Sequence, residues 1–315
     1  MPARDVVVVG AGVIGLSVAV RLAETGRAVR VLAREMPLDT TSAVAAALWY
    51  PYRIRPVARV RAWAARGLAE FARLSQDPAS GVVLRQGTEL LRERQPDPWW
   101  SSLVPGFERL GDVPAPYVDG WSFEAPVVEM PVYLPWLQDR LEALGGIVER
   151  RELSTLPADL PVLVNCSGLG ARTLLGDTTV TPVRGQVVVL SQVGVESWTL
   201  DGSGLTYVVP RSHDVIVGGT DLEGEWDLEP DRDVAAAILA RATALVPELA
   251  RAEVLGNKVG LRPARPQVRL DIEHMSSGRR VVHCYGHGGA GVTVSWGCAD
   301  EVVAMADQEL TEGPG

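Results

Sequence analysis

The N-terminal stretch VVVVGAGVIGL, residues 6–16, joins a run of valines to a glycine-rich turn. The valines predict a strand buried on both faces over residues 5–10. Gly10 permits a tight turn, Gly12 lets the backbone approach a pyrophosphate, and Gly15 allows the next helix to pack close to the strand. This order of strand, glycines and helix indicates a dinucleotide-binding turn rather than a purely structural one.

The residues after this turn complete a βαβ unit. A helix is expected over 13–25, with Gly26 as its C-cap, followed by a second strand over 28–33. Glu35 comes at the end of that strand, about 20 residues past the turn, where an acid binds ribose hydroxyls. The acid favours an unphosphorylated ribose, whereas the neighbouring Arg34 weakens that inference.

A second glycine-rich turn lies near the other end of the chain, in VVHCYGHGGAGVT, residues 281–293. Its glycines, over 286–291, precede a predicted helix whose first turn contains Thr293, so backbone amides and a positive helix end could face the N1/O2 edge of a flavin. Two such turns at opposite ends of the chain suit one long ligand, which favours FAD over NAD; a tight turn without ligand is the alternative. His287 is expected to be a loop histidine without an acid–base role.

The segment GLRPARPQVR, residues 260–269, places three arginines among two prolines. Proline stiffens the backbone, and a rigid arginine can bind a carboxylate through two parallel hydrogen bonds. Arg262 is the best candidate, because apolar residues flank it, while Arg265 and Arg269 could equally form surface salt bridges. Tyr207, in a predicted strand, is either a packing residue or a hydroxyl that bonds a substrate carboxylate.

Composition excludes several partners. The chain has 315 residues and a net charge of −9, which argues against nucleic acid or an anionic membrane. The arginine cluster at 53–61 is expected to be a solvated helix start. The odd number of cysteines, without C-x-x-C spacing, gives no disulfide framework and fits a reducing cytoplasm. The histidines lack metal-ligand spacing, so no metal is expected.

No targeting signal is expected. Residues 6–20 are apolar but contain the glycine turn rather than a signal peptide, and no run is long enough to span a membrane. The ending TEGPG, residues 311–315, is not a peroxisomal address. We therefore expect a cytoplasmic protein.

The pattern along the chain predicts an α/β protein, in which a Rossmann-like FAD-binding domain is interleaved with a mainly antiparallel β-sheet substrate domain. Helices are expected at 57–75, 134–144, 231–246 and 292–308. Strands are expected at 81–92, 161–168, 183–219 (several, antiparallel), 253–261, 268–273 and 280–284, with a long irregular connection over 95–120. The FAD-binding domain would comprise 1–49, 134–182 and 255–315, and the substrate or interface domain 50–133 and 183–254.

In this order the motifs resemble those of the D-amino-acid oxidase family, FAD-dependent oxidases related to D-aspartate oxidase. The matching stretches span nearly the whole chain: VVGAGVIGL (8–16), TTSAVAAALWYPY (40–52), NCSG (165–168), YVVP (207–210), GLRPARPQVRL (260–270) and YGHGGAGVT (285–293). The arginine–proline segment followed by Y-G-H-G-G is highly specific, and separates this family from glycine and sarcosine oxidases.

The resemblance implies oxidative deamination of D-amino acids to 2-oxo acids, ammonia and hydrogen peroxide, with hydride transfer from Cα to flavin N5 and molecular oxygen as the second substrate. It implies that Arg262 and Tyr207 hold the substrate carboxylate, and that the Gly289 carbonyl accepts from the amino group. It also implies a substrate pocket with Tyr50, Tyr52 and Ser203. FAD would be lined by Gly10, Gly12, Val13, Ile14, Gly15, Arg34, Glu35, Thr40, Thr41, Ser42, Ala47, Leu48, Ser167, Gly168, Arg262, Gly286, Gly288, Gly289, Gly291, Val292 and Thr293.

Three departures from mammalian members predict a more open pocket. Gly202-Ser203-Gly204 replaces a lid tyrosine, Tyr50 replaces a glutamine, and Ala290 replaces a tyrosine. Neutral or apolar D-amino acids are the expected substrates, and a monomer or homodimer the expected assembly. D-Aspartate oxidase is the first alternative and would need a further cation: Arg53, Arg55 or Arg211. An NAD-dependent dehydrogenase and a non-catalytic flavoprotein are the others.

Overall fold

The computed structural model describes residues 6–157, 162–275 and 280–307. The outermost residues of three expected elements, at 5, 161 and 308, lie outside these ranges, as does the ending 311–315. Within the described ranges, no helix is both long enough and apolar enough to cross a bilayer.

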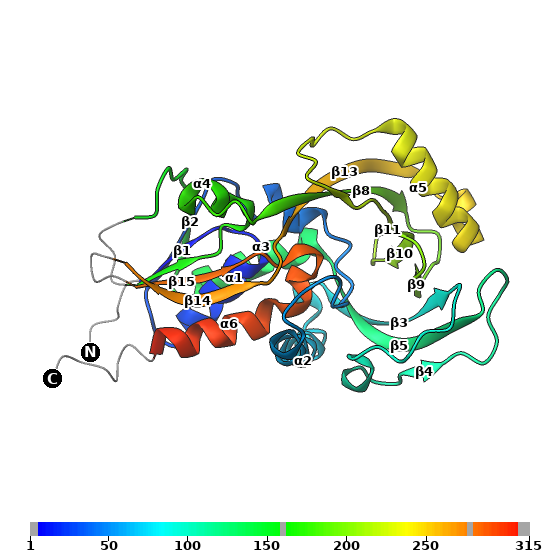
Figure 1. Cartoon of the computed structure of the whole chain (residues 1–315), viewed down its shortest axis with the longest axis horizontal. Coiled ribbons are helices and arrows are strands. Elements are labelled where there is room, and N and C mark those ends of the chain that lie inside the picture. The colour runs from blue at the N-terminus through cyan, green and yellow to red at the C-terminus, as the bar shows by residue number, and fades with distance from the viewer. Residues whose placement is uncertain (1–5, 158–161, 276–279, 308–315) are drawn as a thin grey trace.

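Two sheets lie side by side and organise the chain (Figure 1). The first has six strands in the order β14-β15-β7-β1-β2-β6, all parallel except the edge strand β14. Its central strand is the valine run of the first glycine turn, which is buried as expected. The strands are β1 (Val6–Val9), β2 (Val29–Ala33), β6 (Ile147–Arg150), β7 (Val162–Asn165), β14 (Arg269–His274) and β15 (Arg280–Tyr285).

Three long helices of the described chain contact this sheet: α1 (Val13–Glu24), α3 (Met130–Ala143) and α6 (Gly291–Asp307). A further long helix, α2 (Val57–Leu74), packs on α6. Helix α1 contacts both α3 and α6, and α2 crosses α6. Helices α2 and α6 cross closely because a glycine on each helix lies against the backbone of the other. A Cβ atom on Gly67 would lie 2.2 Å from the Thr293 carbonyl oxygen, and one on Gly297 would lie 2.3 Å from the Trp63 Cα.

The second sheet has nine strands in the order β12-β8-β11-β10-β9-β3-β5-β4, with β13 paired to β8. All pairs are antiparallel except β3 with β9. Helix α5 (Arg232–Leu245) covers β8 and β11, and the short helix α4 (Ala171–Leu175) follows β7. The strands are β3 (Val82–Leu91), β4 (Glu108–Arg109), β5 (Asp119–Val128), β8 (Thr181–Ser191), β9 (Trp198–Asp201), β10 (Tyr207–Pro210), β11 (Asp214–Gly218), β12 (Leu222–Glu223) and β13 (Val254–Ala264).

The predicted fold class, a parallel nucleotide-binding sheet joined to a mainly antiparallel sheet, is confirmed. Helix α3 begins at Met130 rather than at 134, because Pro131 is tolerated in the first turn and Pro135 is accommodated inside the helix. Strand β5 starts within the stretch 95–120, which was expected to be irregular, and pairs along its whole length with β3.

Most elements, but not all, lie in the sheet that the predicted division into an FAD-binding and a substrate domain assigns to them. All strands of the six-stranded sheet fall within 1–49, 134–182 and 255–315. Strand β13, however, pairs with β8 in the nine-stranded sheet, and α2 packs on α6. The domain boundaries as such stay a prediction.

Candidate active site

A cavity of about 910 Å³ runs from the first glycine turn to the nine-stranded sheet. It is lined at one end by residues that follow the carboxyl ends of β1, β2 and β7. This is where open α/β sheets bind their ligands. The other end is lined by residues of β3, β9 and β10 and by the second glycine turn.

The first glycine turn has the expected geometry. Gly10 has φ +108°, and a Cβ atom there would lie 2.5 Å from the Cys166 carbonyl oxygen. Gly12 faces the cavity, and the hydroxyl of Ser42 accepts a hydrogen bond of 3.0 Å from the Val13 amide. The bare backbone at the start of α1 therefore forms a cradle that a side chain would fill, as binding of a pyrophosphate requires.

Two polar groups at this end of the cavity fit the rest of a dinucleotide. Glu35 lines the cavity at the end of β2 and accepts a hydrogen bond of 2.7 Å from Arg34. Ser167 lines it beyond β7, and its buried hydroxyl has no hydrogen-bond partner among the residues that the structure describes. A buried hydroxyl needs a partner, which ribose or phosphate oxygens would provide. The donor set therefore fits FAD.

The second glycine turn meets the chain around Tyr50. The Thr293 hydroxyl accepts from the Tyr50 amide and donates to the Tyr50 carbonyl oxygen, both at 3.0 Å. Gly289 lies against Tyr52, since a Cβ atom there would come within 2.9 Å of the Tyr52 ring. This turn and the start of α6 thus form the wall of the cavity between its two ends.

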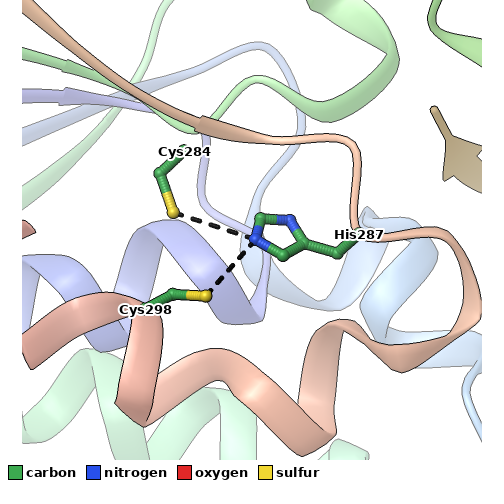
Figure 2. A group of neighbouring side chains, drawn as sticks. All are labelled: Cys284, His287 and Cys298. Carbon is green, nitrogen blue, oxygen red and sulfur yellow. Dashed lines mark hydrogen bonds between the residues drawn. The ribbon is translucent and has the colours of Figure 1, made fainter. Parts of the chain in front are cut away.

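A buried trio of Cys284, His287 and Cys298 anchors the second turn (Figure 2). The two sulfurs lie 3.8 and 3.6 Å from His287 Nε2. Burial raises the pKa of the Cys298 thiol, which keeps it protonated and able to donate to the imidazole. These residue types also bind metals, and the sequence spacing did not reveal the trio because its members come from β15, the turn and α6. The expected absence of a metal stays a prediction.

Arg262 is the arginine of the arginine–proline segment that lines the cavity. Its Nη1 donates to the Thr220 carbonyl oxygen at 2.9 Å and lies 3.8 Å from a carboxylate oxygen of Asp221. The guanidinium lies over Gly185, where a Cβ atom would come within 2.4 Å of Nη2. Asp221 also accepts from the Tyr52 hydroxyl at 2.9 Å, so it positions two groups that line the cavity.

Tyr207 lies beside Arg262 and also lines the cavity. Its ring lies directly over β11, since a Cβ atom on Gly218 would come within 2.1 Å of Tyr207 Cζ. Burial raises the pKa of Tyr207, and the Arg262 guanidinium offsets part of that rise. The phenol is therefore a neutral hydrogen-bond donor next to a fixed cation.

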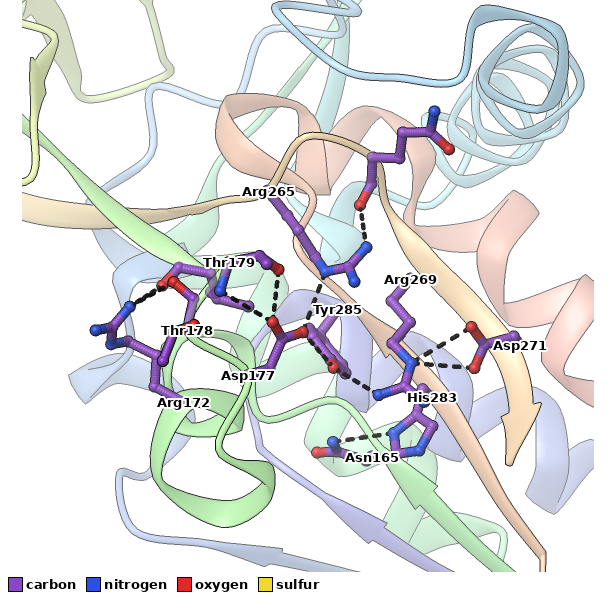
Figure 3. Close-up of polar contacts among 12 residues, drawn as sticks. Asn165, Arg172, Asp177, Thr178, Thr179, Arg265, Arg269, Asp271, His283 and Tyr285 are labelled. Atoms are coloured by element: carbon purple, nitrogen blue, oxygen red, sulfur yellow. Dashed lines mark hydrogen bonds and ion pairs between the residues drawn. The ribbon is translucent and has the colours of Figure 1, made fainter. Parts of the chain in front are cut away.

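Arg265 and Arg269 belong to a polar network around Asp177 and Tyr285 (Figure 3). Arg265 pairs with Asp177 at 3.1 Å, and Arg269 donates to the Tyr285 hydroxyl at 3.0 Å. That hydroxyl in turn donates to Asp177 at 2.8 Å. Neither arginine lines the cavity, so the salt-bridge interpretation holds for both.

Most residues expected to hold FAD or substrate do line the cavity, including Tyr50 and Tyr52. Gly15, Gly286 and Ser203 do not. A Cβ atom on Gly15 would lie 1.9 Å from the Gly10 carbonyl oxygen, so Gly15 serves helix packing. Gly286 has φ +86° and packs on Arg265, while the Ser203 hydroxyl accepts from the Arg92 amide. Those that do line it are Gly10, Gly12, Val13, Ile14, Arg34, Glu35, Thr40, Thr41, Ser42, Ala47, Leu48, Ser167, Gly168, Tyr207, Arg262, Gly288, Gly289, Gly291, Val292 and Thr293.

Glu89, a buried carboxylate on β3 that no sequence motif singles out, also lines the cavity. Both of its oxygens lie 3.0 Å from the Tyr50 hydroxyl, and one accepts from the Trp121 indole at 2.7 Å. Burial raises the pKa of Glu89, and the hydrogen bonds from Trp121 and Tyr50 limit the rise. Only the register of the nine-stranded sheet shows that this strand residue faces the cavity.

The fold and the cavity are those of a nucleotide-binding protein in which a second, mainly antiparallel sheet lines the other end of the cavity. The chain belongs to the DAO family, described as FAD dependent oxidoreductase, whose model matches residues 5–305. Its cofactor is FAD. Both the recognised family and the predicted cofactor are thereby confirmed.

Named relatives match over nearly the whole chain. A D-amino-acid oxidase from Rubrobacter xylanophilus is 51% identical over 314 residues, covering 97% of this chain and 96% of the relative. A D-aspartate oxidase from Homo sapiens is 38% identical, covering 98% and 96%. The crystal structure of a glycine oxidase from Bacillus cereus is similar in fold, with a TM-score of 0.80 at 19% identity over 98% of this chain and 96% of that one.

Proposed function

We propose that this protein is a D-amino-acid oxidase, which converts D-amino acids with neutral or apolar side chains to 2-oxo acids, ammonia and hydrogen peroxide. Relatives named D-amino-acid oxidase, among them one of 51% identity, support this activity. FAD, when bound, supplies the two-electron oxidation at Cα and the reduction of oxygen. The protein must bind FAD and hold the substrate Cα–H in a reactive position.

The proposal rests most directly on the meeting of Arg262, Tyr207 and Gly289 in the cavity that begins at the first glycine turn. Gly289 lies next to Arg262, since a Cβ atom on it would come within 3.5 Å of Arg262 Cδ. The guanidinium and the phenol offer donors to a carboxylate, and the Gly289 carbonyl offers an acceptor to an amine. Three points of attachment fix the handedness of an α-amino acid, so that one enantiomer presents its Cα hydrogen to the cofactor.

We assign FAD to the rest of the cavity. The backbone at Gly10–Ile14 would hold the pyrophosphate, Glu35 the ribose, and the turn before Thr293 the flavin edge that becomes negative on reduction. The vacant hydroxyl of Ser167 and the bare backbone at Gly12 support this placement.

D-Aspartate oxidase is the alternative, and it needs a second cation near the substrate. Arg53 pairs with Asp221, and Arg211 pairs with Asp214 at 2.5 Å. Neither these two arginines nor Arg55 lines the cavity, among the residues that the structure describes. The nearby Glu89 carboxylate would oppose a second negative charge.

Steady-state oxidation of D-valine and D-aspartate tests this choice. The proposed function gives a kcat/KM at least about tenfold higher for D-valine, because a like charge near a buried carboxylate costs more than about 1.4 kcal/mol. A preference for D-aspartate would move the protein to the alternative.

We also propose a cytoplasmic location and a monomer or homodimer, with no nucleic acid or membrane partner. All three cysteines are buried free thiols, as a reducing compartment allows. The net charge of −9 supports the absence of nucleic acid. Gel filtration with light scattering would measure the assembly.

A further inference from the structure

One cross-strand row of the nine-stranded sheet connects the candidate substrate anchor to a buried acid. Tyr207 on β10 is opposite Leu200 on β9, and Leu200 is opposite Glu89 on β3. Residues directly opposite one another present their side chains on the same face of a sheet. All three line the cavity, so the acid and the phenol face the same space.

The spacing of this row suits a long substrate side chain. Strands lie about 4.8 Å apart, so Glu89 and Tyr207 are separated by about 10 Å along the sheet, with Leu200 between them. A lysine-length side chain spans about 6 Å from Cα to its terminal nitrogen, given bonds of about 1.5 Å. Leu200 provides the apolar surface that its methylene groups would cover.

The Glu89 carboxylate is buried without a cation. Within the described residues, no arginine, lysine or histidine nitrogen lies within ion-pair distance of it, and its partners are the neutral donors Tyr50 and Trp121. A carboxylate can accept about four hydrogen bonds, so capacity remains. Buried charges are normally paired, and the cavity is the side from which a partner could come.

The residues around Glu89 add a second carboxylate and leave space beside its side chain. Asp201, at the end of β9, also lines the cavity, although Arg92 pairs with it at 3.2 Å. Gly202 follows, and a Cβ atom there would lie 2.5 Å from Glu89 Oε1. The absence of a side chain at Gly202 leaves room for that oxygen.

We propose that Glu89 forms a subsite for the cationic end of a long side chain, so that basic D-amino acids such as D-lysine are favoured substrates. This inference rests on the proposed function and extends its substrate range beyond neutral side chains. The substrate carboxylate binds at Arg262 and Tyr207, the methylene groups cover Leu200, and the ammonium donates to Glu89.

The test compares substrates that differ only in the terminal charge. D-Lysine and D-norleucine have the same carbon chain, and only D-lysine carries a terminal ammonium group. D-Glutamate and D-glutamine also share one carbon chain, which ends in a carboxylate in the first and in a neutral amide in the second. In the wild-type holoenzyme, kcat/KM is expected to be at least about tenfold higher for D-lysine than for D-norleucine, since a hydrogen bond to a charged group contributes that much. In Glu89→Gln this ratio falls by about 10- to 100-fold, and the ratio of D-glutamate to D-glutamine rises.

Glu124→Gln is the matched control, because Glu124 lies on the neighbouring strand β5 and does not line the cavity. It should change neither ratio. Equal ratios in wild type and in an FAD-loaded Glu89→Gln would overturn the inference while leaving the oxidase activity intact. If the wild type oxidised neither D-norleucine nor D-lysine, the proposed function itself would be overturned.

A binding measurement on the wild-type holoenzyme covers the case in which Glu89→Gln does not fold. 6-Aminohexanoate and hexanoate are lysine and norleucine without their α-amino groups, and both can be titrated through the flavin spectrum. The inference requires 6-aminohexanoate to bind about tenfold or more tightly. Equal or weaker binding of the amino compound overturns it.

Discussion

The guanidinium of Arg262 lies directly over Gly185, so close that a Cβ atom on the glycine would stand 2.4 Å from Nη2. The two residues are on paired strands, β13 and β8, and the glycine is opposite Gly260 rather than Arg262 itself. The missing side chain therefore creates the place that the arginine occupies. The positioning of the candidate carboxylate anchor is a property of the sheet as much as of the arginine.

Replacement of Arg262 is expected to be severe. Arg262→Ala should cost about 3–5 kcal/mol of transition-state binding, because it removes one partner of a desolvated charge pair. The value of kcat/KM for D-alanine should therefore fall on the order of a hundred- to several-thousand-fold. Arg262→Lys should also be poor, since the forked geometry is lost. The assay is steady-state oxidation with the flavin content of each variant measured beside it. An unchanged kcat/KM would remove Arg262 from the site.

Gly185→Ala should weaken substrate binding without changing any polar group. The added methyl group would displace the Arg262 guanidinium, so KM for D-alanine should rise about tenfold or more. Gly256→Ala, on β13, is the control, because a Cβ atom there has no neighbour within 4 Å. Equal KM values for the two variants would show that Gly185 does not position the arginine.

Glu35 should contribute to FAD affinity rather than to folding. Glu35→Gln removes a charged acceptor at the end of β2, which should weaken FAD binding about tenfold. Fluorescence titration of the apoprotein with FAD measures the Kd. Glu149→Gln, on the adjacent strand β6 and away from the cavity lining, should bind FAD as the wild type does. Identical Kd values for all three proteins would contradict the assignment of the ribose.

The network around Asp177 should stabilise the fold above the acid range. Burial opposes ionisation, but hydrogen bonds from Thr179, Tyr285 and Arg265 outweigh it and lower the pKa of Asp177 to about 2 from the usual 3.8. Stability from this group is therefore fully present above pH 3.8 and is lost as the pH falls towards about 2.

Urea unfolding of wild type and Asp177→Asn across this pH range checks that prediction. The variant should be less stable near neutral pH, and the difference should shrink as the pH falls through the interval. The exposed Asp112→Asn serves as control. A difference that stays constant down to pH 2 would mean that the Asp177 carboxylate is not stabilised by its partners.

Local signals were sufficient for much of this structure. The valine run, the glycines and the spacing to Glu35 predict the βαβ unit, because each acts within a few residues. The apolar residues on both sides of Arg262 single it out from the neighbouring arginines as the one that lines the cavity. In the sequence Pro135 resembles a helix boundary, so the predicted start of α3 at residue 134 is wrong: the helix begins at Met130 and accommodates the proline.

Non-local pairing could not be inferred in this way. Glu89 looks like an ordinary strand residue until β3, β9 and β10 come into register. The trio of Cys284, His287 and Cys298 forms only when β15 and α6 meet. Ser203, which the family resemblance places in the pocket, lies instead outside the cavity lining, in the turn between β9 and β10. Tertiary contacts determine these placements, and no short window of sequence contains them.

The visible spectrum of the purified protein, recorded without oxygen before and after addition of single amino acids, tests the central claim most directly. The account predicts flavin bands that bleach on addition of D-alanine or D-valine and persist with L-alanine. Bleaching by D-aspartate alone would assign the protein to the alternative. Absence of flavin bands even after FAD is supplied, or equal bleaching by L-alanine, would contradict the account.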